Sequence, residues 1–295
     1  MKKKFLGWAG ILFLTLACGL INPATPAQPG VETIVAATMQ ALTPVESAPT
    51  QGTPPTQAPQ PDGISVNFEN VSLVIPNGLA NGAAGEKIPA STEENGAPWE
   101  VGPAYIKFTL SSYPLQETMC SPEIKIYPAE EYRLVDLIVG ERMDEVKTIA
   151  TNPNAALPEN LPFLPFVNAG QVFYAQMQAV YFQNGSGIRY VTQFDQAPIP
   201  INNQEMFYTY QGLSQDGKYF ISATFPINIA FLPADGSPNT PAPVDGVPMD
   251  WENFENFPTY LDAVTQKLGS ANSDAFIPSL SNLDALIQSI TISAP

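Results

Sequence analysis

The C-terminal three quarters of the chain is built from short blocks in which hydrophobic and polar residues alternate, the period expected of β-strands. The clearest region contains four such blocks in succession, at residues 171–183, 187–194, 205–212 and 218–227. Connections rich in Asn, Asp, Ser and Gly separate the first pair and the last pair, and such connections favour hairpin turns. The sequence therefore predicts an antiparallel meander, with Phe173 and Tyr181 on the same face of its first strand.

Further strands are predicted where the same alternation recurs in shorter form. They lie at residues 64–68, 71–75, 105–110, 123–127 and 290–292. The intervening segment 77–103 is rich in Gly and Asn and predicts a loop. A second long loop is predicted at 228–250, where five prolines interrupt the chain.

Three segments change to helical spacing. Between residues 128 and 151 apolar side chains recur every three or four positions, which predicts one amphipathic helix ended by Asn152. A second helix is predicted to begin at Pro258 and to be capped by Gly269. A third, at 278–287, has Ser281 and Asp284 in the spacing of a capping box.

The order of these elements predicts an α+β fold: one mostly antiparallel β-sheet (meander) flanked by helices. We expect a single globular domain over residues 64–295, preceded by a disordered stalk. The stalk, residues 18–63, is rich in Pro and Thr and offers too little apolar surface to form a core.

The N-terminus has the three parts of an export signal. Lys2–Lys4 precede an apolar stretch of about a dozen residues that is too short to span a bilayer. The segment Thr15-Leu16-Ala17-Cys18 follows it. This segment resembles the lipobox of bacterial lipoproteins, with Thr15 in place of the usual branched residue. The resemblance implies cleavage after residue 17, acylation of Cys18, and attachment to the bacterial cell membrane on its extracytoplasmic side. A plain secretory signal cut at a nearby alanine-rich site is the alternative.

The C-terminal layout, a helix and a short strand within LDALIQSITI, is loosely similar to PsbP-like domains. Together with the Pro/Thr stalk it also resembles uncharacterised bacterial surface lipoproteins. Neither resemblance carries a known activity to this chain.

The amino-acid composition of the chain excludes several classes of function. The net charge is −16, and removal of the signal segment leaves 9 Lys plus Arg against 28 Asp plus Glu. Such an acidic chain is predicted to bind no nucleic acid, which requires a basic surface. The sequence contains no histidine, so triads of the Ser-His-Asp type and histidine-ligated metals are excluded. We expect no cofactor and no metal, because no motif for either is present. Cys120 is expected to be a buried, unreactive thiol.

A candidate ligand-binding face is predicted on the meander, where aromatic, amide and basic residues are expected to lie side by side. It comprises Tyr174, Gln176, Gln178, Arg189, Gln193, Thr209 and Gln211. The sequence thus favours a non-catalytic lipoprotein that binds a small molecule or an envelope protein. The alternatives are an assembly or maintenance factor for an envelope complex, and a hydrolase that uses paired carboxylates such as Glu205 and Asp216.

Overall fold

The computed structural model describes residues 60–92, 94, 101–152 and 154–293. These residues belong to one compact unit, Pro55–Pro295. Cys18, the signal segment and the stalk up to residue 59 lie outside the described residues. Of the helices in the described ranges, none is long and apolar enough to cross a membrane.

The expected α+β fold is confirmed. The strands are β1 (Gly63–Phe68), β2 (Val71–Pro76), β3 (Gly82–Ile88), β4 (Tyr105–Ser111), β5 (Glu123–Pro128), β6 (Gly170–Phe182), β7 (Gly185–Asp195), β8 (Phe207–Ser214), β9 (Tyr219–Pro226), β10 (Asn228–Ile229), β11 (Phe276–Ile277) and β12 (Thr291–Ile292). The helices are α2 (Ala129–Arg133), α3 (Leu137–Thr151), α4 (Phe257–Ser270) and α5 (Leu280–Ser289), with short 3-10 turns at Phe254–Asn256 and Ser273–Ala275.

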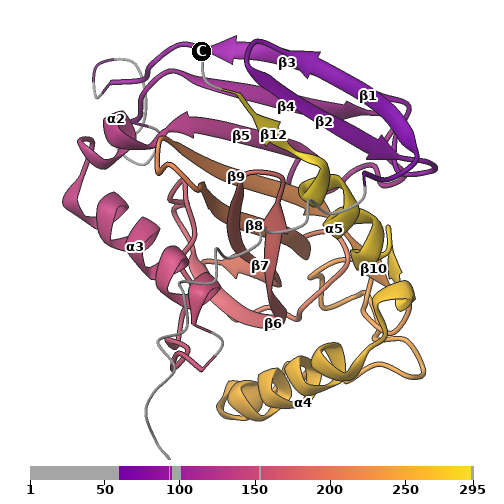
Figure 1. Cartoon of the computed structure of the whole chain (residues 1–295). Helices are drawn as coiled ribbons and strands as arrows, with labels where there is room; N and C mark the ends of the chain where they lie inside the picture. The colour runs from indigo at the N-terminus through magenta and orange to yellow at the C-terminus, as the bar shows by residue number, and fades with distance from the viewer. Residues whose placement is uncertain (1–59, 93, 95–100, 153, 294–295) are drawn as a thin grey trace, which may run out of the picture. The chain divides into compact units, whose positions relative to one another are not determined.

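The centre of the fold is a seven-stranded antiparallel sheet in the order β3-β4-β5-β9-β8-β7-β6. A second sheet, in the order β1-β2-β12, joins the N-terminal hairpin to the last strand of the chain. Helices α2 and α3 cover one face of the large sheet, whereas α4, α5 and the small sheet lie on the other (Figure 1). We call these the α3 face and the α5 face.

The α5 face carries the larger core. Side chains from β8 and β9, among them Tyr208, Ile221 and Phe225, pack there against β2 and the apolar sides of α4 and α5. The α3 face is covered by a smaller cluster, which includes Met143 and Val146 of α3 together with Tyr190 and Phe220 of the sheet.

The predicted meander is confirmed as β6 to β9, with strand ends within a few residues of those expected. One detail is wrong. A bulge between Ala175 and Gln178, where Gln176 has a φ of 58°, reverses the alternation of β6. Phe173 therefore faces the core of the α5 side, whereas Tyr181 is exposed.

Other elements differ from the expectation for local reasons. The single helix predicted between residues 128 and 151 is two helices, because Asp136 adopts an extended conformation and accepts a hydrogen bond from the Ile138 backbone. Strand β3 forms inside the segment expected to be a loop, where it pairs along its whole length with β4.

Two predicted caps are wrong. Helix α4 continues past Gly269 to Ser270, because Gln176 donates from its side chain to the backbone carbonyls at the end of the helix. Helix α5 is capped by Ser279 rather than Ser281. Asp284 does not complete a capping box. It accepts a hydrogen bond from Tyr208 instead.

Candidate functional site

The seven residues of the predicted ligand-binding face do not share a face. In the register of β7 and β8, Arg189 lies opposite Tyr210, so it points away from Thr209 and Gln211. Tyr174, Thr209 and Gln211 lie on the α3 side, whereas Gln176, Gln178, Arg189 and Gln193 make their contacts on the other side or at the strand ends. The expectation of one continuous face is therefore wrong, and strand alternation together with the β6 bulge is the reason.

On the α3 side these residues hold the connector 158–169 against the sheet. Gln211 accepts a hydrogen bond from the Leu164 backbone at 3.0 Å and donates to Thr209 and Ser222. Ser222 in turn donates to the Leu164 carbonyl at 2.5 Å. Tyr174 donates to the Pro158 carbonyl. Since Gln211 and Thr209 are fully buried, they support the fold rather than present a surface.

The other four residues anchor the helices and loops of the opposite side. Arg189 forms a buried ion pair with Asp284 of α5, Nε to Oδ1 at 3.3 Å, and donates to the side chain of Gln178. Gln193 bonds both the Asn202 backbone and the Glu205 carboxylate. All four have hydrogen-bonding partners within the protein, which accounts for the polar residues on the meander.

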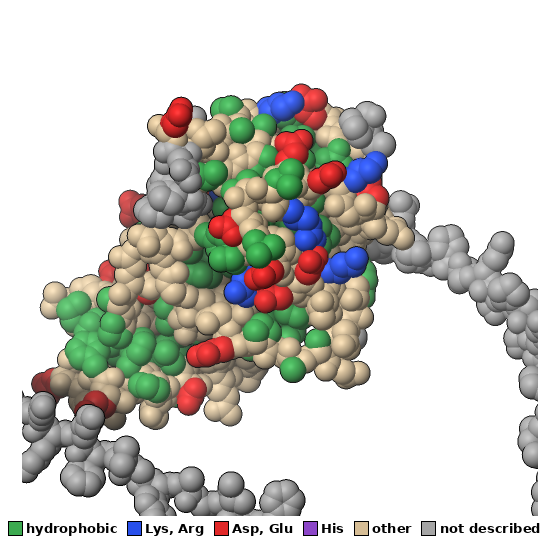
Figure 2. Space-filling model, turned by 90° about the vertical axis from the view of Figure 1, so that its left-hand side faces the viewer, with side chains coloured by type: hydrophobic (Ala, Val, Ile, Leu, Met, Phe, Trp, Pro, Cys, Tyr) green, Lys and Arg blue, Asp and Glu red, His purple; other side chains and the backbone are tan. Residues whose placement is uncertain are grey.

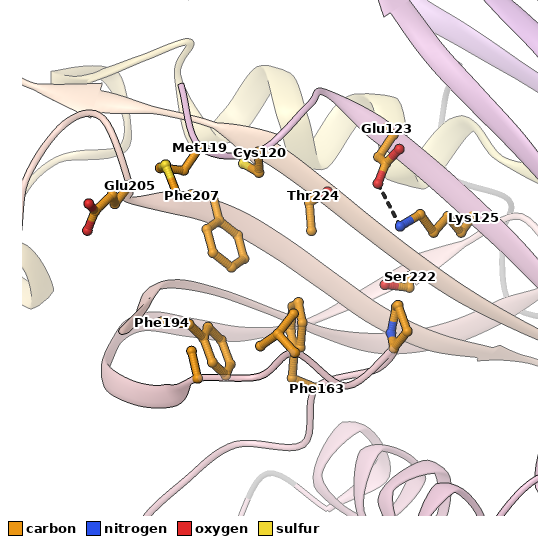
Figure 3. Close-up of a pocket in the computed structure, with 13 residues that line it drawn as sticks. Met119, Cys120, Glu123, Lys125, Phe163, Phe194, Glu205, Phe207, Ser222 and Thr224 are labelled. Carbon is orange, nitrogen blue, oxygen red and sulfur yellow. Dashed lines mark ion pairs between the residues drawn. The ribbon is translucent and has the colours of Figure 1, made fainter. Parts of the chain in front are cut away.

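The site that the structure does form is a cavity of about 290 Å³ beside this scaffold (Figure 3). It lies on the α3 face, between the connector and the ends of β5, β7, β8 and β9. The connector forms one wall through Phe163, Pro165 and Val167, and the loop before β5 contributes Met119 and Cys120. The cavity is close to the lower end of the size range of small-molecule sites.

One part of the cavity is aromatic. The rings of Phe163, Phe194 and Phe207 contact one another, with centroids 4.7 Å apart for the first two and 6.2 Å apart for the last two. Met119 and Val167 extend the apolar lining to the surface, where their exposed fractions are 72% and 43%. An apolar surface that continues from an interior wall to an exposed rim favours contact with an apolar ligand.

The opposite end of the cavity is ionic. Glu123 and Lys125 are neighbours on one side of β5, and their carboxylate and ammonium groups are 2.7 Å apart. Only 19% of the Glu123 side chain and 21% of the Lys125 side chain are exposed. In Figure 3 both charged groups lie beside the cavity, above Ser222, and Glu205 lies at its far end.

Glu205 lies in hydrogen-bonding contact with a second acid, Asp195. Burial, and after it the hydrogen bond with Asp195, raises the pKa of Glu205 to about 7. Gln193 donates to both carboxylates, at 3.1 Å and 3.0 Å, and Asn202 donates to Glu205. Glu205 is therefore partly protonated near neutral pH.

The pairing of Glu205 with Asp216 considered from the sequence does not occur. Glu205 precedes β8 and Asp216 follows it, in the turn where it bonds Ser214 and Lys218. The two acids are thus at opposite ends of a strand. Asp195, the actual partner of Glu205, is in direct hydrogen-bonding contact, which is closer than either separation typical of glycoside hydrolases.

Cys120 is half-buried at the edge of the cavity. Burial raises the pKa of its thiol to about 12, and the nearby charge of Glu123 acts in the same direction. The thiol is thus protonated at neutral pH, as an unreactive cysteine should be.

Acidic residues around the second long loop satisfy local backbone groups. Asp250 accepts hydrogen bonds from the Glu252 and Asn253 backbones, and Asp235 accepts one from the Ser237 backbone. No three His, Cys, Asp or Glu side chains within the described ranges are grouped as a metal site would require.

The described residues line two other hollows. One of about 490 Å³ adjoins the first cavity and shares Lys125, Pro165 and Val167 with it. Another, of about 570 Å³, lies beside α4. Asp245 and Lys267 are its charged lining residues. Lys267 is already engaged, because it lies 4.7 Å from the Phe231 ring centroid and donates to the Asp245 carbonyl. The face seen in Figure 2 mixes acidic, basic and hydrophobic side chains.

The residues of the cavity were missed because they are scattered along the sequence. Two signals were present: the repeated Leu-Pro-Phe of residues 161–166, and the Glu-x-Lys alternation of Glu123 and Lys125 opposite the core residues Ile124 and Ile126. Neither signal shows that the connector folds back over β9.

No family model, curated protein or solved structure matches this chain. The class of protein is therefore defined by the fold and the cavity alone.

Proposed function

We propose that this chain is a membrane-anchored extracytoplasmic lipoprotein whose globular part binds a small, mainly apolar molecule without catalysing a reaction. The observation that carries the binding function is the cavity of about 290 Å³ with three phenylalanine rings at one part and an ion pair at the other. Its size favours a single compact ligand, such as a substituted aromatic ring, over a long lipid or an oligosaccharide.

The physical basis for binding is the transfer of apolar ligand surface from water to the phenylalanine wall. Each square ångström of apolar area buried contributes about 25 cal/mol. A ring-sized ligand also gains from edge or offset stacking with the cavity rings. The wall is held in place without the ligand, because Tyr190, Gln211 and Ser222 bond the connector backbone. Little ordering of the protein is therefore required on binding.

Binding is tested with 2-phenylethanol as the probe and the full chain in detergent micelles. We expect the melting temperature to rise by a few degrees at a ligand concentration of about ten times Kd. Ala169→Phe, which places a ring in the cavity from the connector, is the matched control. It should abolish the shift and leave the unliganded protein folded. An equal shift in both proteins would show that the probe acts on the micelle or on another surface.

The proposed anchor is tested separately. Replacement of Cys18 with alanine removes the acylated thiol, and two acyl chains are what stable attachment to a bilayer requires. We expect the Cys18→Ala protein to leave the membrane fraction and the wild-type protein to remain in it. An unchanged membrane-bound fraction, or a mature N-terminus without fatty acid by mass spectrometry, would refute the anchor and leave the cavity proposal intact.

A further inference from the structure

The ion pair of Glu123 and Lys125 occupies an unusual position for two charged groups. Strand β5 directs Ile124 and Ile126 into the main core, so Glu123 and Lys125 point to the other side. There Lys125 lies opposite Ser222 and Glu123 lies opposite Thr224 of β9. Both charges are thus fixed by strand register at the wall of the cavity.

The two charged groups are largely withdrawn from water but only partly satisfied. An ammonium has three donors and a carboxylate accepts about four hydrogen bonds. Of the contacts formed by the described residues, each group has the other as its one side-chain ion-pair or hydrogen-bond partner. About one fifth of each side chain is exposed, and both charged groups lie beside the cavity in Figure 3.

The chemistry of the ligand follows from this charge arrangement. A ligand with only a positive charge would compete with Lys125 for Glu123, and one with only a negative charge would compete with Glu123 for Lys125. Either case leaves a partly buried charge with a weaker partner, which is costly. An anion is also repelled by the overall charge of −16. A ligand with both charges satisfies both groups and carries no net charge.

We infer, on the basis of the proposed binding function, that the ligand is a small zwitterion with an apolar substituent, bound with its carboxylate at Lys125, its ammonium at Glu123 and its substituent against Phe163, Phe194 and Phe207. An apolar α-amino acid is the simplest molecule of this class. The cavity volume accommodates one such molecule, and the aromatic wall selects large apolar substituents over small or charged ones.

The test compares four probes that share a phenylethyl group and differ in charge: L-phenylalanine, phenethylamine, 3-phenylpropionate and 2-phenylethanol. Calorimetric titration of the full chain at neutral pH should give L-phenylalanine an affinity at least about tenfold higher than each of the others. Lys125→Met and Glu123→Gln should each remove this advantage and leave the affinity for 2-phenylethanol within about threefold.

Two matched control variants each remove a charge of the same sign at a position outside the cavity. Lys218→Met breaks an exposed pair in the β8–β9 turn, and Glu141→Gln lies on the exposed side of α3. Both should leave the affinity for L-phenylalanine unchanged. The probe comparison on the wild-type protein does not depend on whether the cavity variants fold.

The outcomes separate the inference from the proposed function. If the four probes bind with similar affinity, the cavity binds aromatic ligands without charge selection, and the zwitterion inference is refuted while the proposed function stands. Tighter binding of 3-phenylpropionate or phenethylamine would show that one charge acts alone and would refute the inference equally. If none of the four binds at millimolar concentration, the proposed cavity function is refuted as well.

Discussion

The pair of Asp195 and Glu205 gives the protein a stability that depends on pH in a defined direction. The pKa of Glu205 is raised from 4.5 to about 7 in the folded protein, first by burial and then by the hydrogen bond with Asp195. A group whose pKa is raised on folding stabilises the fold when protonated. That contribution is complete below pH 4.5 and is lost as the pH rises through about 7.

The magnitude follows from the two pKa values. Each pKa unit corresponds to about 1.36 kcal/mol, so the full difference is at most about 3.4 kcal/mol. Glu205 is only half-buried, and screening by solvent reduces this figure to about 1–2 kcal/mol. The groups that face Glu205 are Asp195 and Asp235, which are acidic, and the amides of Gln193 and Asn202.

Glu205→Gln tests this reasoning, because a glutamine side chain keeps a donor for Asp195 and cannot ionise. The variant should be more stable than wild type by about 1–2 kcal/mol at pH 8, which is about 3–6 °C in melting temperature for a domain of this size. Near pH 5 the two proteins should be nearly equal. Thermal unfolding followed by circular dichroism from pH 5 to pH 8 measures the difference.

Glu141→Gln is the control, because it removes an exposed glutamate with the same chemical change; its difference from wild type should be flat with pH. A Glu205→Gln protein that is less stable than wild type at pH 8 would refute the argument. So would a stability difference of the same size at pH 5 and pH 8, since that result would mean that ionisation of Glu205 costs nothing.

Three further predictions follow from other buried groups. Cys120 should react with iodoacetamide at pH 8 roughly a thousandfold more slowly in the folded protein than in the unfolded chain, because its thiol pKa is about 12 instead of 9; comparable rates would contradict the burial of the thiol. Gly187→Ala should lower the free energy of unfolding by about 3 kcal/mol or more in urea titration, since an added Cβ would lie 2.1 Å from the Gln211 carbonyl oxygen. Arg189→Met should cost about 3–5 kcal/mol in the same assay, because Asp284 would remain buried without its cationic partner; a loss below 1 kcal/mol would show that this ion pair contributes little.

Much of the fold follows from short-range patterns. Strands β6 to β9 could be predicted because their alternation and turn residues are local properties of the chain. The bulge at Gln176 could not, since it depends on a left-handed backbone conformation stabilised by contacts of Gln176 with the end of α4, nearly a hundred residues away. Strand β3 was missed because Gly82 and Gly85 are typical of loops, and its stability comes from pairing with β4.

The candidate site was harder to predict than the fold. Tyr, Gln and Arg on the meander resemble a ligand-binding surface by residue type, but type does not show whether a side chain already has a partner inside the protein. Gln211 illustrates the difference: it is fully buried and bonds the Leu164 backbone, which lies 47 residues earlier in the chain. Only the register of β8 and the path of the connector identify it as part of the scaffold.

The contrast between the residues that bond the connector and the cavity beside them supports the proposed binding function. Three buried polar groups beside the cavity are well paired: Ser222, Gln211 and Tyr190 each bond the connector that forms the cavity wall. Next to these bonded groups lie a cavity of about 290 Å³ and a partly satisfied ion pair. Apolar surface that lacks packing contacts and charges with few partners both reduce stability. Places where a sequence departs from the rules of stable packing are commonly functional sites, and here both departures meet at one cavity.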